Sequence, residues 1–276
     1  MVAMRVLSWN LWWRFGPWQR RQPAIATEFD LIDADLSCLQ EVWCDADDGD
    51  QAEHLAARRG LHVARSTGSD GRPFGFGNAI LSRWPILESD TLVLPGIDGK
   101  PSHRSAVVAV VAGPQGAQLV ASTHLAWQYE QSQLRQHQLA FLVPVLDRQH
   151  RQIGNDLPMI LAGDFNAVPE SDEIRRLTGL APGYGPPLVF TDAWAATNAE
   201  PGFTWDRSNP HSRDAQWPRR RLDYVFVSWP RPKPTGNPLS ARLAGRDPHA
   251  GVVPSDHSAV VVELDDRRPE DLTPPS

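Results

Sequence analysis

Polar side chains with catalytic chemistry stand beside the ends of several apolar, strand-like runs in this sequence. They are Asn10 after VLSW, Glu41 after LSCLQ, His124 after LVAST, Asp164 and Asn166 after MILAG, and Asp256 with His257 just before SAVVVEL. Strand ends are where layered α/β folds assemble their sites, and a buried carboxylate needs a cation or hydrogen-bond donors beside it. One such residue alone is an ordinary cap or turn. Their recurrence at five strand ends predicts one shared site.

The chemistry of this set points to a hard metal ion. Carboxylate and amide oxygens with histidine, and without thiolate, favour Mg²⁺ or Mn²⁺ over zinc. The cysteines, Cys38 and Cys44, flank Glu41 and are too sparse for a zinc motif. Two cysteines in 276 residues also exclude a secreted disulfide scaffold, so we expect both thiols to be packed or inert.

Three further polar residues have a structural explanation beside the functional one. Asp223, in RLDYVF, can pair with neighbouring Arg221, and Asn166 can make an Asx turn after its strand. Taken singly, either structural explanation is as good as the functional one. Arg104 begins another apolar run in SHRSAVV, where a lone arginine is more often a surface ion pair, so we leave it outside the predicted site.

The apolar runs that position these residues are short and rich in β-branched side chains, which predicts strands. They are Arg5–Trp9, Leu36–Val42, Asn78–Ser82, Arg104–Val111, Gln118–Thr123, Pro158–Ala162, Leu222–Ser228 and Ser258–Leu264. Amphipathic stretches between them predict helices at Gln22–Ile32, Gln51–Arg59 and Tyr129–Leu146, with Pro144 as a kink or end of the last. Hairpin-like pairs at Asn78–Val93 and Arg104–Thr123 lack a helix between their strands. The sequence therefore predicts two mixed sheets flanked by helices.

Length and composition indicate a single domain. With 276 residues, of which 41% are hydrophobic and 22% charged, the chain can bury a full core. We expect the domain to cover residues 1–265, followed by a disordered tail at 266–276, whose charges and prolines offer nothing to bury. The polar segment Asp206–Arg221 is expected to be a long mobile loop with a functional role.

The charge balance and the apolar runs exclude several classes of protein. The chain has 27 Lys and Arg against 33 Asp and Glu, a net charge of −6, so no global positive field favours nonspecific coating of DNA. No apolar run approaches the ~20 residues that a membrane-spanning helix needs, and none resembles a signal peptide. We therefore expect a cytoplasmic protein without integral membrane association, and we predict no protein partner.

Seven stretches, taken in order, resemble the motif set of the endonuclease/exonuclease/phosphatase superfamily, which includes DNase I, exonuclease III, neutral sphingomyelinase and tyrosyl-DNA phosphodiesterase. They are LSWNLW, LQEVW, GNAILSRWPI, STHL, LAGDFNAVPES, RLDYVFVS and SDHSAVVVEL. The resemblance runs from about Arg5 to Leu264, and GDFN and SDH are its most specific pieces. It implies a DNase I-like α/β (α+β) fold, a four-layered sandwich of two mixed β-sheets flanked by α-helices.

The resemblance also implies a role for each site residue. Glu41 would be the principal ligand of Mg²⁺, with Mn²⁺ as a substitute, and Asn10 and Asp256 would sit beside the metal. Asp164, held by Asn166, would orient or deprotonate a water that attacks the phosphorus in line with the leaving oxygen.

Histidines complete the implied site. His257 would bind a nonbridging phosphate oxygen or help protonate the leaving group, with Asp223 accepting its other N–H. His124 corresponds to a second phosphate-contacting histidine of the DNase and sphingomyelinase branches.

The sequence leaves the substrate open. Trp9, Trp12, Trp13 and Trp18 cluster near Asn10 with Arg14, Arg20 and Arg21, a combination that suits stacked nucleobases with phosphates and equally a lipid headgroup. Arg219, Arg220 and Arg221 can add local charge, and GFTWD resembles a segment that borders the substrate in tyrosyl-DNA phosphodiesterase. Three functions remain: a phosphodiesterase acting on nucleic acid or a nucleotide adduct, which we favour, the same chemistry on a phospholipid, and a noncatalytic binding module.

Overall fold

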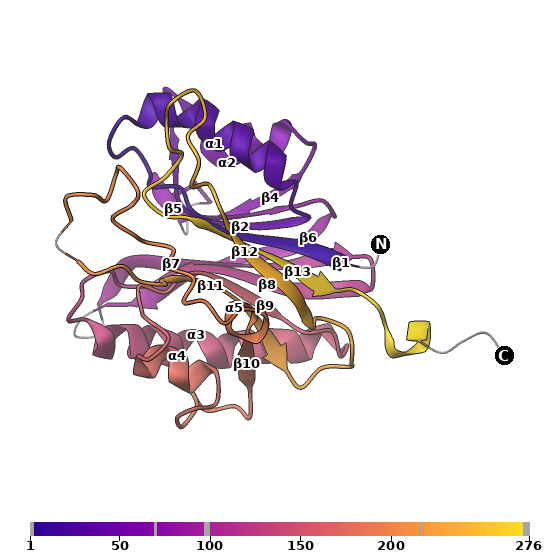
Figure 1. The fold of residues 1–276 in the computed structure, drawn as a ribbon. Helices are drawn as coiled ribbons and strands as arrows, with labels where there is room; N and C mark the ends of the chain where they lie inside the picture. Colours follow the sequence, from indigo (N-terminus) through magenta and orange to yellow (C-terminus); the bar gives the residue numbers. More distant parts are fainter. Residues whose placement is uncertain (1–2, 69–70, 97–99, 216, 273–276) are drawn as a thin grey trace.

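Two β-sheets lie face to face, and helices cover the outer face of each, which gives four layers (Figure 1). The computed structural model describes residues 3–68, 71–96, 100–215 and 217–272. Both sheets contain parallel and antiparallel pairs. The predicted fold class, α/β (α+β) with two mixed sheets between helices, is thereby confirmed.

The first sheet is covered by two helices from the N-terminal part of the chain. Its strands in spatial order are β12 (Pro238–Ala244), β13 (Ala259–Asp265), β1 (Ala3–Asn10), β2 (Leu36–Asp45), β5 (Phe76–Ser82) and β4 (His62–Arg65), with the short β3 (Gly49–Asp50) paired to β2. Helices α1 (Trp18–Ile32) and α2 (Gln51–Ala57) lie over it, at the top of Figure 1. Ile25 and Phe29 of α1 pack with Leu7 and Leu39 of the sheet, which fixes the ends of β1 and β2.

The second sheet is covered by helices from the middle of the chain. Its strands in spatial order are β10 (Val189–Asp192), β11 (Asp223–Trp229), β9 (Ile160–Asp164), β8 (Gly116–His124), β7 (Pro101–Gly113) and β6 (Ile86–Pro95). Helices α3 (Ser132–Ile153) and α4 (Asp172–Leu177) lie against it, and α5 (Ala193–Thr197) follows β10. Leu139 and Leu142 of α3 pack on Leu161 of β9.

Strand β7 shows why these runs are apolar throughout. Side chains alternate between the two faces of a strand. Val107 and Val111 face the core between the sheets, whereas Ala106 and Val108 face the core under α3. A strand buried on both faces has no polar side, and this is the pattern that the sequence displays.

The connection between β5 and β6 differs from the prediction. The predicted hairpin at Arg104–Thr123 is correct, because β7 and β8 pair antiparallel. The predicted pair at Asn78–Val93 is wrong: β5 pairs with β2 and β4 in the first sheet, whereas β6 pairs with β7 in the second. The chain passes from one sheet to the other through residues 83–85. A two-sided core gives both strands the same pattern, so periodicity cannot tell a hairpin from this crossing.

Two other predicted boundaries also differ from the structure. Helix α3 runs through Pro144 to Ile153 and ends at Gly154 in the left-handed conformation, so the end predicted near Leu146 is wrong. In the segment predicted to be disordered, Pro269–Leu272 form the 3₁₀ helix η2, and Arg268 Nη2 donates to a backbone oxygen at 2.7 Å. Residues 273–276 lie outside the described residues.

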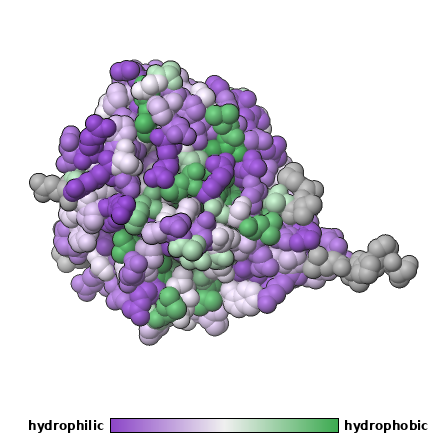
Figure 2. All heavy atoms as spheres, viewed as in Figure 1, coloured by the Kyte–Doolittle hydropathy of each residue, from purple (hydrophilic) through white to green (hydrophobic). Residues whose placement is uncertain are grey.

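The surface in the view of Figure 2 is mostly hydrophilic, with small groups of hydrophobic residues between the polar ones. Among the described residues, no helix is both long and apolar enough to cross a membrane.

Candidate active site

Strand register brings most of the predicted site residues together. On the parallel pair β8 and β9, His124 stands opposite Asp164, and on the antiparallel pair β9 and β11, Asp164 stands opposite Asp223. These three side chains therefore lie in one row across three neighbouring strands. In the facing sheet, Asn10 ends β1 and stands opposite Gln40 of β2, the residue before Glu41.

A break in strand β2 turns Glu41 toward this row. The pairing of β2 with β5 shifts register between Leu39 and Val42, as in a β-bulge. Glu41 has φ of +54°, a left-handed conformation that a glutamate rarely adopts. Asn166 has φ of +49°. Backbone strain at two members of one cluster is typical of a functional site.

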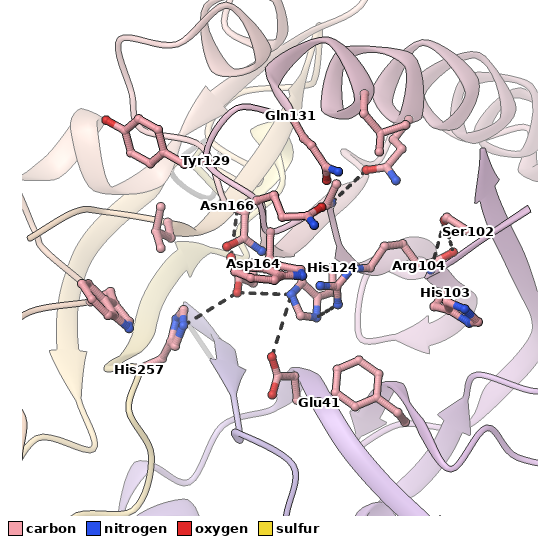
Figure 3. A pocket seen from close by; sticks show the side chains of 18 of the residues that line it. Glu41, Ser102, His103, Arg104, His124, Tyr129, Gln131, Asp164, Asn166 and His257 are labelled. Atoms are coloured by element: carbon pink, nitrogen blue, oxygen red, sulfur yellow. Dashed lines mark hydrogen bonds and ion pairs between the residues drawn. The ribbon is translucent and has the colours of Figure 1, made fainter. Parts of the chain in front are cut away.

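Asn10, Glu41, His124 and Asp164 form one polar cluster between the sheets, and Figure 3 shows the last three of them. Asn10 Nδ2 donates to Glu41 Oε1 at 3.2 Å and to Asp164 Oδ2 at 3.0 Å. His124 Nε2 lies 3.5 Å from Asp164 Oδ2 and 4.0 Å from Glu41 Oε1. The Asn166 backbone N–H donates to Asp164 Oδ1 at 2.9 Å, so both oxygens of Asp164 are held in place. The Asx turn here is made by the side chain of Asp164 and not by that of Asn166, whose Nδ2 donates to Leu125 O at 3.3 Å.

His257 and Asp223 form a dyad beside this cluster. His257 Nδ1 lies 2.8 Å from Asp223 Oδ2, and His257 Nε2 lies 3.9 Å from Asp164 Oδ2. The GFTWD segment supports the dyad, because Thr204 Oγ1 accepts from the backbone N–H of Asp223. Trp205 forms a backbone bridge with His257. The carboxylate of Asp223 therefore orients His257 with its Nε2 toward Asp164.

Asp223 does not pair with its neighbour Arg221. Arg221 Nη1 donates instead to Asp192 Oδ2 at 2.7 Å, and both of these side chains are buried. Arg221 therefore supplies no charge to the site, and the structural explanation considered for Asp223 is wrong.

The surroundings of the carboxyl groups in the cluster disfavour their ionised forms. Burial, and next the charge of Asp256, raise the pKa of Glu41 to about 7, and burial and the charge of Asp223 raise the pKa of Asp164 to about 6. Burial likewise raises the pKa of Asp256. Such shifts are typical of catalytic and metal-binding groups.

The two histidines have opposite electrostatics. Burial opposes a charge on His257, but Asp223, Asp256 and Asp164 outweigh it and raise its pKa well above the ordinary value. Burial and the charge of Arg104 lower the pKa of His124 well below its ordinary value. These opposite shifts favour the protonated form of His257 and the neutral form of His124.

Arg104 is a site residue that the sequence interpretation left out. Its Nη1 lies 3.0 Å from His124 Nδ1, its guanidinium lies over the ring of Phe76, and it lines the cavity with Glu41. Burial lowers its pKa, against the charges of Glu41 and Asp164. The expected surface ion pair is thus wrong. The antiparallel register of β7 and β8 is the feature that places Arg104 in the site, because it sets the start of β7 beside His124.

Arg21 was expected to contribute to substrate binding, but the structure places it in a structural role. Its fully buried guanidinium donates to five backbone oxygens, those of Leu11, Trp12, Trp13, Phe15 and Pro254. Arg21 therefore shapes the tryptophan-rich loop and does not face a phosphate. Trp12 of that loop lines the cavity.

The donor set fits a hard divalent cation. Among the described residues, none donates a hydrogen bond to the buried oxygens Glu41 Oε2 and Asp223 Oδ1. Asp164, Asp223 and His257 offer atoms within 4.8 Å of one another and could hold a metal ion. Asp223 also has an unpartnered oxygen, but its other oxygen holds His257 in the dyad, whereas, in the part of the chain that the structure describes, the Glu41 side chain accepts only from the Asn10 amide and keeps Oε2 free beside the other carboxylates. Glu41 is therefore the better candidate for the principal ligand.

A cavity of about 880 Å³ opens above the cluster. Its floor carries Asp164, His257 and Glu41, and Asp256 also lines it. Its walls are mainly aromatic and basic, with residues that include Phe15, Phe76, Lys100, Arg104, Trp127, Tyr129, Trp205, Trp217 and Arg220. In Figure 3, Tyr129 and Arg104 lie on opposite sides of Asp164. Such walls suit an anionic ligand with a planar group.

Comparison with known proteins agrees with this geometry. The sequence matches the Endonuclease/Exonuclease/phosphatase family over residues 7–257. The chain belongs to this family. Members of the Endonuclease/Exonuclease/phosphatase family are in general hydrolases that act on phosphoester bonds and depend on a divalent metal ion.

Curated relatives within the family match part of their length. Protein angel homolog 2 of Mus musculus is 28% identical over 163 residues, which is 56% of this chain and 30% of the mouse protein. Protein angel of Drosophila melanogaster is 26% identical over 186 residues, 60% of this chain and 48% of the fly protein. The matched region thus spans less than half of either relative.

Solved structures of family members share the fold. Truncated TDP2 of Caenorhabditis elegans has a TM-score of 0.75 at 19% identity, covering 95% of this chain and 98% of that chain. D. rerio TDP2 complexed with single strand DNA product has a TM-score of 0.73 at 19% identity, with 95% and 99% covered. The human Nocturnin catalytic domain with bound sulfate anion has a TM-score of 0.68 at 20% identity, with 95% and 94% covered.

Proposed function

We propose that this protein is a Mg²⁺-dependent phosphodiesterase that hydrolyses a phosphate ester of nucleic acid or of a nucleotide adduct. One observation carries the proposal. Asp164, held by Asn10 and Asn166, lies 3.9 Å from the Nε2 of a histidine that Asp223 orients, on the floor of a cavity with basic walls. In this arrangement Asp164 can take a proton from water, and the neighbouring His257 can donate a hydrogen bond to the phosphate.

The chain's own groups account for the proton transfers. Asp164 accepts a proton from the attacking water as the new oxygen–phosphorus bond forms, and the bond to the leaving oxygen breaks on the opposite side. His257 Nε2 donates to a nonbridging phosphate oxygen or to the leaving oxygen, while Asp223 keeps the ring in place. His124 and Arg104 extend the donor set on the other side of Asp164.

Glu41 would hold the metal ion, with Asn10 and Asp256 beside it. The unpartnered Glu41 Oε2 and the raised pKa of this carboxyl both support the assignment, because a cation would relieve the buried negative charge. When bound, Mg²⁺ would stabilise negative charge that develops on the phosphate. We expect Mn²⁺ to substitute for it.

The walls of the cavity support a nucleic-acid substrate. Arg104, Lys100 and Arg220 offer positive charge near the cluster despite the net charge of −6, and aromatic rings stand between them. A fold neighbour, D. rerio TDP2, is described with a single strand DNA product. Aromatic platforms beside basic groups are the usual means of binding unpaired bases.

A phospholipid substrate is the second candidate, because aromatic side chains stand exposed at the mouth of the cavity. Trp127 is 57% exposed and Phe15 is 47% exposed. Such rings can insert at a membrane interface. A noncatalytic binding module is disfavoured, because each of the predicted site residues is present and lies in the cluster or lines the cavity.

The test is one panel of hydrolysis assays with bis(p-nitrophenyl) phosphate, DNA oligonucleotides and sphingomyelin, each in Mg²⁺, Mn²⁺ or EDTA. We expect metal-dependent cleavage of the oligonucleotides, lost in His257→Ala and weakened steeply by salt. Cleavage of sphingomyelin alone, with little salt dependence, would support the lipid function. Unchanged turnover in His257→Ala would refute the mechanism.

A further inference from the structure

Two aromatic side chains from distant loops stack on each other beside the catalytic cluster. Tyr129 belongs to the loop between β8 and α3, and Trp217 to the loop before β11. Their ring centroids lie 4.9 Å apart with an angle of 14° between the planes. Tyr129 is 53% exposed and Trp217 is 42% exposed, yet both line the cavity that holds Asp164. The stacked pair thus presents a flat apolar face to solvent within reach of the site.

Arg220 stands beside this pair without an acidic partner. Its guanidinium carbon lies 5.3 Å from the ring centroid of Tyr129, 5.6 Å from that of Trp205 and 5.7 Å from that of Trp217. No ion pair joins it to a carboxylate among the described residues, and its buried Nε has no acceptor there. Burial lowers its pKa, whereas the charges of Tyr129 and Asp164 raise it. Aromatic rings therefore surround this cation, and among the described residues no carboxylate forms an ion pair with its N–H groups.

The backbone fixes Arg220 relative to the dyad. Arg220 N donates to Trp205 O at 2.9 Å, and Trp205 N donates to Arg220 O at 3.0 Å. Trp205 in turn bridges to His257. Two steps of backbone pairing thus connect the backbone of Arg220 to that of His257, and both residues line the same cavity as the aromatic pair, so one ligand can reach all of them.

We propose that Tyr129, Trp217 and Arg220 form a binding site for the nucleotide next to the scissile phosphate, in which an unpaired base stacks on the aromatic pair and Arg220 donates to the nucleotide's phosphate. The inference rests on the proposed nucleic-acid function and narrows it to single strands. A base in a duplex is covered on both faces by its neighbours, so only an unpaired base offers a free face.

The decisive assay compares two single-stranded oligonucleotides that carry a p-nitrophenyl ester on the 5′-phosphate. One has a base on the terminal nucleotide, and the other is abasic there. In Mg²⁺ we expect wild type to release p-nitrophenol with a kcat/KM about tenfold higher for the first. Trp217→Ala and Tyr129→Ala should bring this ratio close to one, whereas Trp217→Phe should keep most of it. Trp229→Ala is the matched control, because Trp229 is 37% exposed and does not line this cavity.

A binding assay separates failure of this site from failure of the proposed function. An oligonucleotide with a terminal 2-aminopurine is added in EDTA, and stacking is read as quenching of its fluorescence. Quenching that Trp217→Ala abolishes, without hydrolysis of any nucleotide ester in Mg²⁺, would support the site and overturn the function. Equal hydrolysis of both esters by wild type would overturn the site and leave the function standing.

Other combinations of results would overturn both proposals or assign the aromatic pair to a different ligand. Absence of both hydrolysis and quenching would overturn both proposals. Loss of binding to sphingomyelin vesicles in Trp217→Ala, with an unchanged base-to-abasic ratio, would assign the aromatic pair to a membrane surface instead. Thermal unfolding of each variant shows whether it is folded, and Trp217→Phe retains a flat ring if Trp217→Ala does not fold.

Discussion

Replacing Glu41 by Gln should stabilise the protein when no metal is bound. The side chain of Glu41 is 14% exposed, and its pKa is raised from 4.5 to about 7, mainly by burial. Between these pH values the native state binds more protons at Glu41 than the unfolded state does. The contribution of Glu41 to the free energy of unfolding therefore falls as the pH rises through this range and stays level above it. At 1.36 kcal/mol per pKa unit, the ionised carboxylate costs about 3 kcal/mol above pH 7. The amide introduced by Glu41→Gln would keep an acceptor for Asn10 without that charge.

The assay is urea unfolding in EDTA at pH 4 and at pH 8. At pH 4 the carboxyl is neutral in both states, so we expect Glu41→Gln and wild type to unfold at similar urea concentrations. At pH 8 we expect the variant to be more stable by up to about 3 kcal/mol. Glu88→Gln is the control, because Glu88 is exposed on the edge strand β6 and should change stability by less than about 0.5 kcal/mol.

Mg²⁺ at about 100 times its Kd should remove most of this difference in stability between Glu41→Gln and wild type. A ligand at 100 times its Kd stabilises the native state by about 2.7 kcal/mol, and we expect wild type to gain this at pH 8 while Glu41→Gln gains little. Stability that is equal for wild type and Glu41→Gln in EDTA at pH 8 would refute the burial argument. An equal gain from Mg²⁺ in both proteins would refute Glu41 as the principal ligand.

Two further predictions concern glycine and cysteine positions. Gly163→Ala should lower the free energy of unfolding by at least about 3 kcal/mol in urea titrations, because φ is +149° and a Cβ would lie 1.9 Å from the backbone oxygen of Thr123. Gly154→Ala, at φ of +75° with no atom within 4 Å of the added Cβ, should cost only about 1 kcal/mol, and similar losses at both sites would contradict the argument. In a thiol titration with a disulfide reagent at pH 8, Cys44 should react in the native protein and Cys38 only after unfolding, because burial raises the pKa of Cys38 to about 12. Equal native reactivity of the two thiols would show that the strand carrying Cys38 opens readily.

The sequence was sufficient to predict which polar residues meet in one cluster, for a physical reason. A carboxylate such as Asp164 at the end of an apolar strand interrupts the burial pattern, and strand pairing then brings several such interruptions to one edge. The structure places every predicted site residue in the cluster or along its cavity.

Arg104 could not be assigned to the site from the sequence, and Arg220 could not be separated from Arg219 and Arg221, because an arginine beside an apolar run has no pattern that fixes the direction of its side chain. For Arg104 the deciding factor is the register of β7 against β8. For Arg220 it is a backbone pairing with Trp205 across a loop. The contact of Tyr129 with Trp217 likewise depends on how two loops meet, which neither propensity nor periodicity encodes.

Single-turnover cleavage of a single-stranded DNA oligonucleotide in Mg²⁺, by wild type and by Asp164→Asn, tests the central claim most directly. Asp164→Asn keeps the size of the side chain and removes the group that takes the proton from water. We expect the cleavage rate to fall by about 10²-fold or more while the oligonucleotide still binds, because this is the usual contribution of a general base. Cleavage by Asp164→Asn at the wild-type rate would contradict the assignment of Asp164 and, with it, the proposed mechanism.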